Sequence, residues 1–355
     1  MQTPVAVASD DWPDRTLVRC FLIACQACSI LLTWPLWQPR SGVGSPPNLP
    51  IFDWPLDQLQ IPLGEALLLS LAIAVFWPRT GTVAHGLLLA LAMALDQLRI
   101  QPEFVSLAIL MAGTLPGRGP LLLARSHLIS LWLWAGLHKL ASSGYVLETG
   151  PQLAQGLFAG LSDGQAIAIG TAMALAELTL GVISMHPLSR RSTPVMAAIL
   201  HGGILLALMH RGWNTAVWPW NLALAAAGYG FFAHWSDPLW AQPPQPPRPW
   251  RIWQAAAAVM LAYPALFYLN LCDGYLAWCV YASNTPEAVI YDRRSPDGER
   301  LFLRAYRPLN VPFSPAVRLY EQHFRRTAQS GDVLEITDPR PLSRWQGKHK
   351  RSLRR

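Results

Sequence analysis

The sequence predicts an all-α polytopic membrane bundle of about nine transmembrane helices, followed by a small α+β appendage. The first observation is composition: 52% of the 355 residues are hydrophobic and only 14% are charged, whereas a soluble domain carries about 25% charge. The second is that apolar stretches of about 17–25 residues, long enough to cross a bilayer, recur up to residue 271. The third is that fifteen of the 28 basic residues lie from Arg293 onward, which sets a polar end apart from the membrane part.

Nine apolar stretches account for the membrane part, residues 16–272. They lie near residues 16–36, 61–78, 82–99, 103–116, 120–140, 164–185, 193–210, 213–235 and 250–271. The fourth is short for a bilayer, so it is also consistent with a re-entrant segment. Prolines separate several stretches: Pro46, Pro47 and Pro50 occupy the first loop, and Gln242–Pro249 predicts a stiff extended connector before the last stretch.

The distribution of arginine predicts the orientation of the bundle. If residues 1–15 form a cytoplasmic segment, the loops on that side carry most of the arginines, as the positive-inside rule requires. They are Arg15, Arg19, Arg79, Arg118, Arg125, Arg190, Arg191, Arg248 and Arg251, against Arg40, Arg99 and Arg211 on the other side. Nine crossings then place the C-terminus outside, and the bacterial inner membrane is the expected location.

The C-terminal region is predicted to be a separate unit. Residues 273–339 should form a small extracytoplasmic α+β domain, and residues 340–355 a basic disordered tail. The expected elements are strands at Ala288–Tyr291, Leu301–Tyr306 and Val333–Ile336, a turn at Pro296–Gly298 and a helix from Ser314. Because the basic excess of this region lies beside a bilayer, it predicts contact with lipid head groups or a protein partner rather than nucleic acid.

Lys139 is the most informative residue of the membrane part. It is the only lysine before Lys348, and it closes the apolar run Ser126–Leu140. An ionisable group in a membrane helix costs about 2.5–3.5 kcal/mol on insertion scales, which makes it a candidate functional residue. The alternative is a lysine that extends from the helix end to the lipid head groups. Helical spacing places Gly136 on the same face, where it would admit another backbone or a flat ligand.

Glu177 and His201 are the other candidates within the apolar stretches. Glu177 is the deepest acid, and a lone carboxylate there is either protonated or paired, with Lys139 or a histidine as the natural partner. His201 is followed by two glycines that leave room beside its imidazole. A lone membrane histidine more often makes a hydrogen bond between helices. No spacing of histidines, cysteines and carboxylates predicts a metal site.

Cys25 and Cys28 form a C-x-x-C pair in the first apolar stretch. In an accessible site such a pair supports dithiol exchange with a quinone. Cysteine is also a small apolar residue that packs well between membrane helices. The packing interpretation is favoured, and redox chemistry stays as an alternative.

Trp134–Leu140, with the sequence WAGLHKL, resembles a motif of the HTTM membrane domain of the vitamin K-dependent gamma-carboxylase family. The resemblance implies that Lys139 is a catalytic base and that the cofactor is a reduced quinone. His201 and the aromatic-Pro-aromatic sequence Trp218–Trp220 are similar to a second part of that domain. Glu177, in AELTLG, resembles a helix of the related DoxX- and MauE-like proteins. The cofactor is expected to contact Trp132, Gly136, His138, Trp218 and Trp220.

The long C-terminal region of that family has no counterpart here, since only a basic segment of about eighty residues follows the bundle. Two functions are therefore open. One is a membrane enzyme at the outer leaflet with Lys139 as base and His201 and Glu177 as supporting groups. The other is a noncatalytic assembly or anchoring factor whose basic tail binds a partner.

Overall fold

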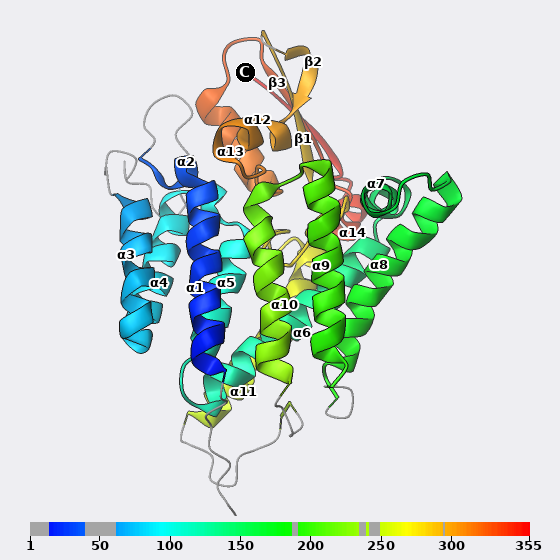
Figure 1. Cartoon of the computed structure of the whole chain (residues 1–355). Helices are drawn as coiled ribbons and strands as arrows, with labels where there is room; N and C mark the ends of the chain where they lie inside the picture. Colours follow the sequence, from blue (N-terminus) through cyan, green and yellow to red (C-terminus); the bar gives the residue numbers. More distant parts are fainter. Residues whose placement is uncertain (1–13, 40–61, 187–190, 234–238, 241–248, 294) are drawn as a thin grey trace, which may run out of the picture.

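The computed structural model describes residues 14–39, 62–186, 191–233, 239–240, 249–293 and 295–355. An upright helical bundle carries a small sheet and its helices at one end (Figure 1). The expected N-terminal segment, the first proline-rich loop and most of Gln242–Pro249 lie outside the described residues.

A helix lies over each of the nine predicted apolar stretches. In chain order they are α1 (Arg15–Leu32), α3 (Leu63–Phe76), α4 (Pro78–Leu95), α5 (Pro102–Gly113), α6 (Arg118–Leu140), α8 (Asp163–Ile183), α9 (Thr193–Arg211), α10 (Trp218–Phe232) and α11 (Trp250–Ala262). The shorter connecting helices are α2 (Trp34–Trp37), η2 (Gln97–Arg99), η3 (Tyr145–Thr149), α7 (Gly150–Leu157), η4 (Thr215–Val217) and η5 (Tyr263–Leu269).

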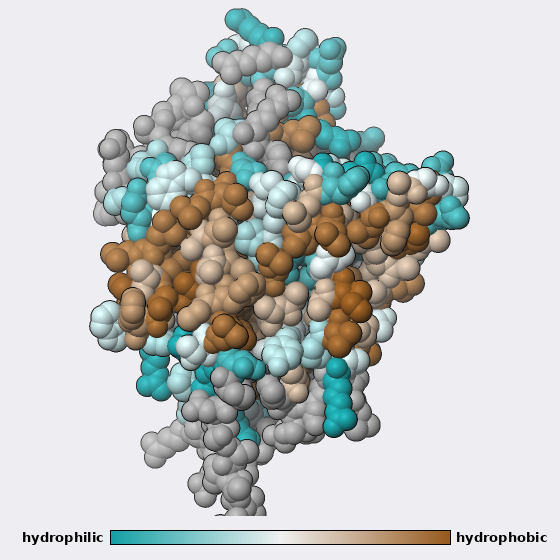
Figure 2. All heavy atoms as spheres, viewed as in Figure 1, coloured by the Kyte–Doolittle hydropathy of each residue, from teal (hydrophilic) through white to brown (hydrophobic). Residues whose placement is uncertain are grey.

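Five of these segments are long and apolar enough to cross a membrane: α1, α6, α8, α9 and α11 with η5. Helices α3 and α5 are apolar but shorter. On the face shown in Figure 2, a band of hydrophobic surface crosses the middle of the bundle, between polar ends. Large apolar side chains of the bundle helices, such as Phe76, Ile199 and Ile252, are at least 70% exposed. Exposed apolar surface of this extent is typical of a membrane interaction site.

The C-terminal domain is built on a four-stranded antiparallel sheet. Its order is β2 (Ser295–Arg300), β1 (Glu287–Asp292), β3 (Val333–Thr337) and β4 (Lys350–Arg354). Three helices accompany the strands: α12 (Leu301–Leu309), α13 (Val317–Thr327) and α14 (Pro341–Trp345). Tyr320 and Phe324, one turn apart on α13, are both buried.

The structure corrects four predictions for this region. The helix expected from Ser314 begins at Val317 instead, with Ala316 as its N-cap residue. Leu301–Tyr306 is not a strand, because α12 buries Leu301 and Leu309, which lie on one helix face. Residues 296–298 are not a turn but lie within β2. The tail from residue 340 is not disordered, since Lys350–Arg354 pairs with β3 along its whole length. An ion pair of 3.1 Å between Arg351 and Glu321 on α13 adds to this pairing.

The C-terminal domain is joined to the bundle at the end where α1 finishes. Asn310 donates to the carbonyl oxygen of Leu32 at 3.0 Å and to Thr215 at 2.8 Å. Arg318 on α13 forms an ion pair with Asp273 and donates to Gln97 at 2.9 Å. Helix α1 begins at the opposite end of the bundle, so the start of the first helix and the C-terminal domain lie at opposite ends (Figure 1).

Candidate functional site

Lys139 is buried inside the bundle rather than extended to its surface. It is the second-last residue of α6, its exposed fraction is 6%, and its ammonium forms an ion pair with Glu177 of α8. Glu177 is equally buried, at 4%. The structure therefore excludes the snorkelling alternative and confirms Glu177 as the partner expected for the lysine.

Two glycines bring α6 and α8 close enough for this ion pair. A Cβ atom added at Gly136 would lie 2.5 Å from the backbone nitrogen of Leu178, and one added at Gly181 would lie 2.6 Å from that of Leu133. The sequence predicted either another backbone or a flat ligand beside Gly136, and the structure shows the backbone of α8 there. The expectation that Gly136 receives a flat ligand is therefore wrong, because α8 fills that space.

Alanine at Gly136 should destabilise the bundle by about 1–3 kcal/mol, because neither backbone can yield without separating α6 from α8. Gly202 on α9 is the matched control, since nothing lies within 4 Å of an added Cβ atom there. Alanine at that position should be neutral or stabilising, given its higher helix propensity. Thermal unfolding of both variants in detergent gives the comparison, and equal stabilities would contradict the close crossing.

Tyr145 of η3 completes the surroundings of Lys139, although the sequence did not indicate it. The lysine nitrogen lies 6.0 Å from the centre of the tyrosine ring, within the range of a cation–π interaction. The hydroxyl of Tyr145 donates to the carbonyl oxygen of Gly170 at 3.2 Å, which fixes the ring against α8. Tyr145 lies six residues after Lys139, in the segment that follows the WAGLHKL motif. This position is the only feature of the sequence from which its contact with Lys139 could have been predicted.

His201 is held in one tautomer between three helices. Trp132 of α6 donates to its Nε2 at 2.8 Å, so Nδ1 carries the proton and donates to Asn221 of α10 at 3.1 Å. Asn221 in turn donates to the carbonyl oxygen of Val217 at 3.0 Å. Both ring nitrogens are thus engaged, and no hydrogen bond joins His201 to Lys139 or Glu177 within the described part of the chain. The arrangement is that of a helix–helix hydrogen bond.

The residues expected to bind the cofactor do not form one slot. His138 donates from Nε2 to the carbonyl oxygen of Ala277 at 3.0 Å and accepts from Tyr268 at 2.8 Å. Trp218 donates to the carbonyl oxygen of Trp213 at 2.9 Å. Trp132 already donates to a histidine, Gly136 is covered by α8, and Trp220 is buried among apolar side chains. The five residues predicted to bind the cofactor therefore take part in at least three separate contacts.

The two cysteines of the C-x-x-C pair in α1 lie in different environments. Cys25 is buried and Cys28 is exposed, and both are free. Elsewhere, burial raises the pKa of the Cys272 thiol, just beyond η5, to about 11, which keeps it protonated and unreactive. No group of three histidines, cysteines or carboxylates that could hold a metal occurs among the residues the structure describes.

Replacing Cys25 and Cys28 together by alanine should change the stability of the bundle by less than about 2 kcal/mol, because little volume is lost. Any activity found for the parent should persist. Thermal unfolding measures the stability, and the oxidation of a reduced menaquinone analogue measures the activity. A folded double variant without activity would favour dithiol chemistry instead.

Comparisons of the chain with protein-family models, with curated proteins and with solved structures find no match.

Proposed function

We propose that this chain is an integral membrane enzyme in which Lys139 acts as a general base, with Glu177 as its counter-ion. The observation that carries the proposal is the burial of a lone lysine against a carboxylate near the end of α6. The resemblance of WAGLHKL to the HTTM motif points to the same residue independently. His201, expected as a third member, instead serves to hold α6, α9 and α10 together.

The ion pair itself provides a route to a neutral amine. In a low-dielectric site, the attraction between two buried charges competes with a desolvation cost of several kcal/mol for each ion. Passing the proton from Lys139 to Glu177 removes both charges and leaves an amine, which is a competent base. The amine then accepts the proton of an acidic O–H or C–H group, which leaves the substrate anion beside the lysine ammonium.

A reduced quinone is the cofactor class that the resemblance implies, although the five residues expected to contact it do not form a slot. The test is to purify the chain from its membrane, extract it with organic solvent and quantify quinone by mass spectrometry. We expect quinone to co-purify with the parent and with Lys348→Ala, whose lysine is exposed in the C-terminal domain. Loss from Lys139→Ala alone supports the proposal, and equal amounts in all three would argue against a quinone at this lysine.

A noncatalytic assembly factor is the second candidate, and β4 is the observation that favours it. This strand is paired only with β3 in the described sheet, and its exposed positions include Lys350 and Arg354. A basic strand at a sheet edge suits an extended acidic partner. Deletion of residues 341–355 would abolish partner capture under this function and leave quinone content unchanged.

The N-terminus is proposed to be cytoplasmic and the C-terminal domain extracytoplasmic, in a bacterial inner membrane. Arg15, Arg79, Arg118 and Arg251 support this, because each lies at the start of a helix and on the expected cytoplasmic side. We expect reporter fusions at Asp14 and Ser330 to report opposite sides. A periplasmic signal at Asp14, or the same side for both fusions, would refute the orientation.

A further inference from the structure

Among the described residues, three buried ring nitrogens besides that of Trp250 have no hydrogen-bond partner. They are Nδ1 of His127 on α6, Nε1 of Trp278 in the segment after η5, and Nε1 of Trp220 on α10. The exposed fractions of the three side chains are 0%, 2% and 5%. Each comes from a different part of the chain, so their common burial is a property of the fold.

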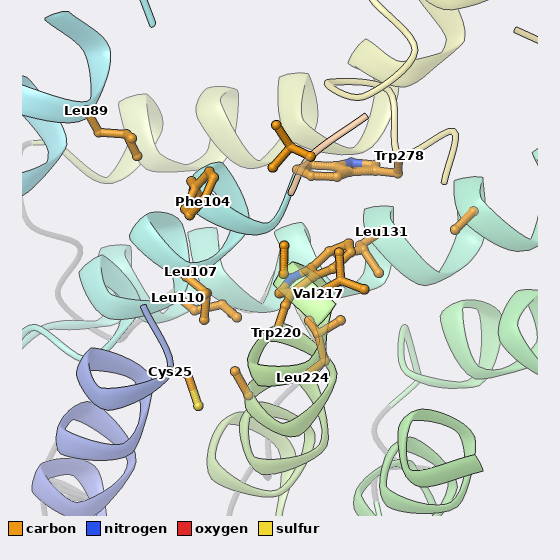
Figure 3. Close-up of a cluster of buried hydrophobic side chains, with 14 of the residues drawn as sticks. Cys25, Leu89, Phe104, Leu107, Leu110, Leu131, Val217, Trp220, Leu224 and Trp278 are labelled. Atoms are coloured by element: carbon orange, nitrogen blue, oxygen red, sulfur yellow. The ribbon is translucent and has the colours of Figure 1, made fainter. Parts of the chain in front are cut away.

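His127 and Trp278 are in direct contact. Their ring centres lie 4.8 Å apart in an edge-to-face arrangement. Nε2 of His127 is already bonded to Ser106 of α5 at 2.8 Å, which leaves only Nδ1 without a partner. Trp220 and Trp278 lie in the same cluster, with Leu131 and Val217 beside them (Figure 3).

Keeping these groups unbonded is costly. A buried donor or acceptor without a partner costs about 1–3 kcal/mol. Trp278 also adopts a φ of 64°, in the left-handed region that a bulky residue rarely occupies. Such strain persists only where the surroundings impose it, and it concentrates at ligand sites. A phenylalanine would fill the same apolar space at no polar cost.

We propose that His127 and Trp278 form a buried site for a neutral acceptor oxygen, with Trp220 as a further donor in the same cluster. An indole N–H only donates, so the ligand must accept a hydrogen bond. The labelled neighbours are largely apolar, among them Phe104, Leu107 and Leu131 (Figure 3), which disfavours an anion. Two sources share this chemistry: an ordered water molecule and the carbonyl oxygen of a quinone.

The experiment follows the indole N–H groups directly. The full chain is labelled with ¹⁵N-indole tryptophan in lipid nanodiscs, and its spectrum is recorded with and without menadione, a small quinone. Trp278→Phe assigns the signal in question and Trp220→Phe assigns the second. Trp134→Phe is the matched control, because that indole already donates to the carbonyl oxygen of Leu261 at 2.7 Å.

The outcomes separate the two sources. A hydrogen-bonded Trp278 signal without menadione, unchanged on its addition, supports the site with water as ligand. A signal that moves to the hydrogen-bonded range with menadione supports a quinone, and Trp278→Phe should then weaken menadione binding about tenfold while Trp134→Phe does not. A signal in the free range under both conditions overturns the site. None of these readouts depends on Lys139, so the result is independent of the proposed enzymatic activity.

Discussion

Arginine in place of Lys139 will leave the bundle folded and lower turnover by about 10²–10⁴-fold, the usual contribution of a general base. The guanidinium can still pair with Glu177, so the buried carboxylate keeps a cationic partner. It cannot act as a base, because arginine keeps its proton in proteins. The measurement is the oxidation of a reduced menaquinone analogue by dissolved dioxygen, which accepts the two electrons, in the presence of the purified chain in lipid. Thermal unfolding confirms the fold.

Lys348→Arg is the control for that experiment, because Lys348 is exposed in the C-terminal domain. It should turn over at the parent rate. Parent-level turnover in a folded Lys139→Arg variant would leave the lysine a purely structural ion-pair partner, and the assembly function would then be favoured.

Alanine in place of Glu177 will destabilise the bundle by about 3–5 kcal/mol, because it leaves the ammonium of Lys139 buried without a counter-ion. Glu148, an exposed acid of η3, is the matched control, and its replacement by alanine should cost less than about 0.5 kcal/mol. Reversible unfolding in mixed detergent micelles measures both free energies.

The double variant Lys139→Met/Glu177→Leu separates pairing from packing. Replacing both charges by apolar side chains of similar volume removes the desolvation cost, so stability should return to within about 2 kcal/mol of the parent. A double variant as unstable as Glu177→Ala would mean that shape rather than charge at this crossing determines stability.

Local physics explains what the sequence could predict. An apolar run satisfies its backbone hydrogen bonds by forming a helix, so a helix lies over every predicted stretch. Five of these segments are long and apolar enough to cross a membrane. The Lys139–Glu177 pair was foreseeable because an isolated charge among apolar helices requires a partner. The sequence could not predict what lies beside Gly136. A glycine would be needed there whether another backbone or a flat ligand approached the helix.

The failures are non-local in origin. Lys350–Arg354 is basic and has no strand-like pattern by itself, and it becomes β4 only because β3 offers its edge. Tyr145 reaches Lys139 through the short helix η3, whose geometry no periodicity encodes. The partners of His138 lie more than a hundred residues later in the chain.

The surroundings of Lys139 are completed late in synthesis, because the end of α6 and the residues after it bond to segments near residue 280. Ala277 accepts a hydrogen bond from His138, and the backbone N–H of Ser283 donates to Ser142 at 3.0 Å. A chain made from its N-terminus inserts α6 long before residues 277–283 leave the ribosome. The helix end that carries Lys139 therefore lacks these hydrogen bonds until most of the protein has been translated. A prematurely terminated product would contain Lys139 without these contacts.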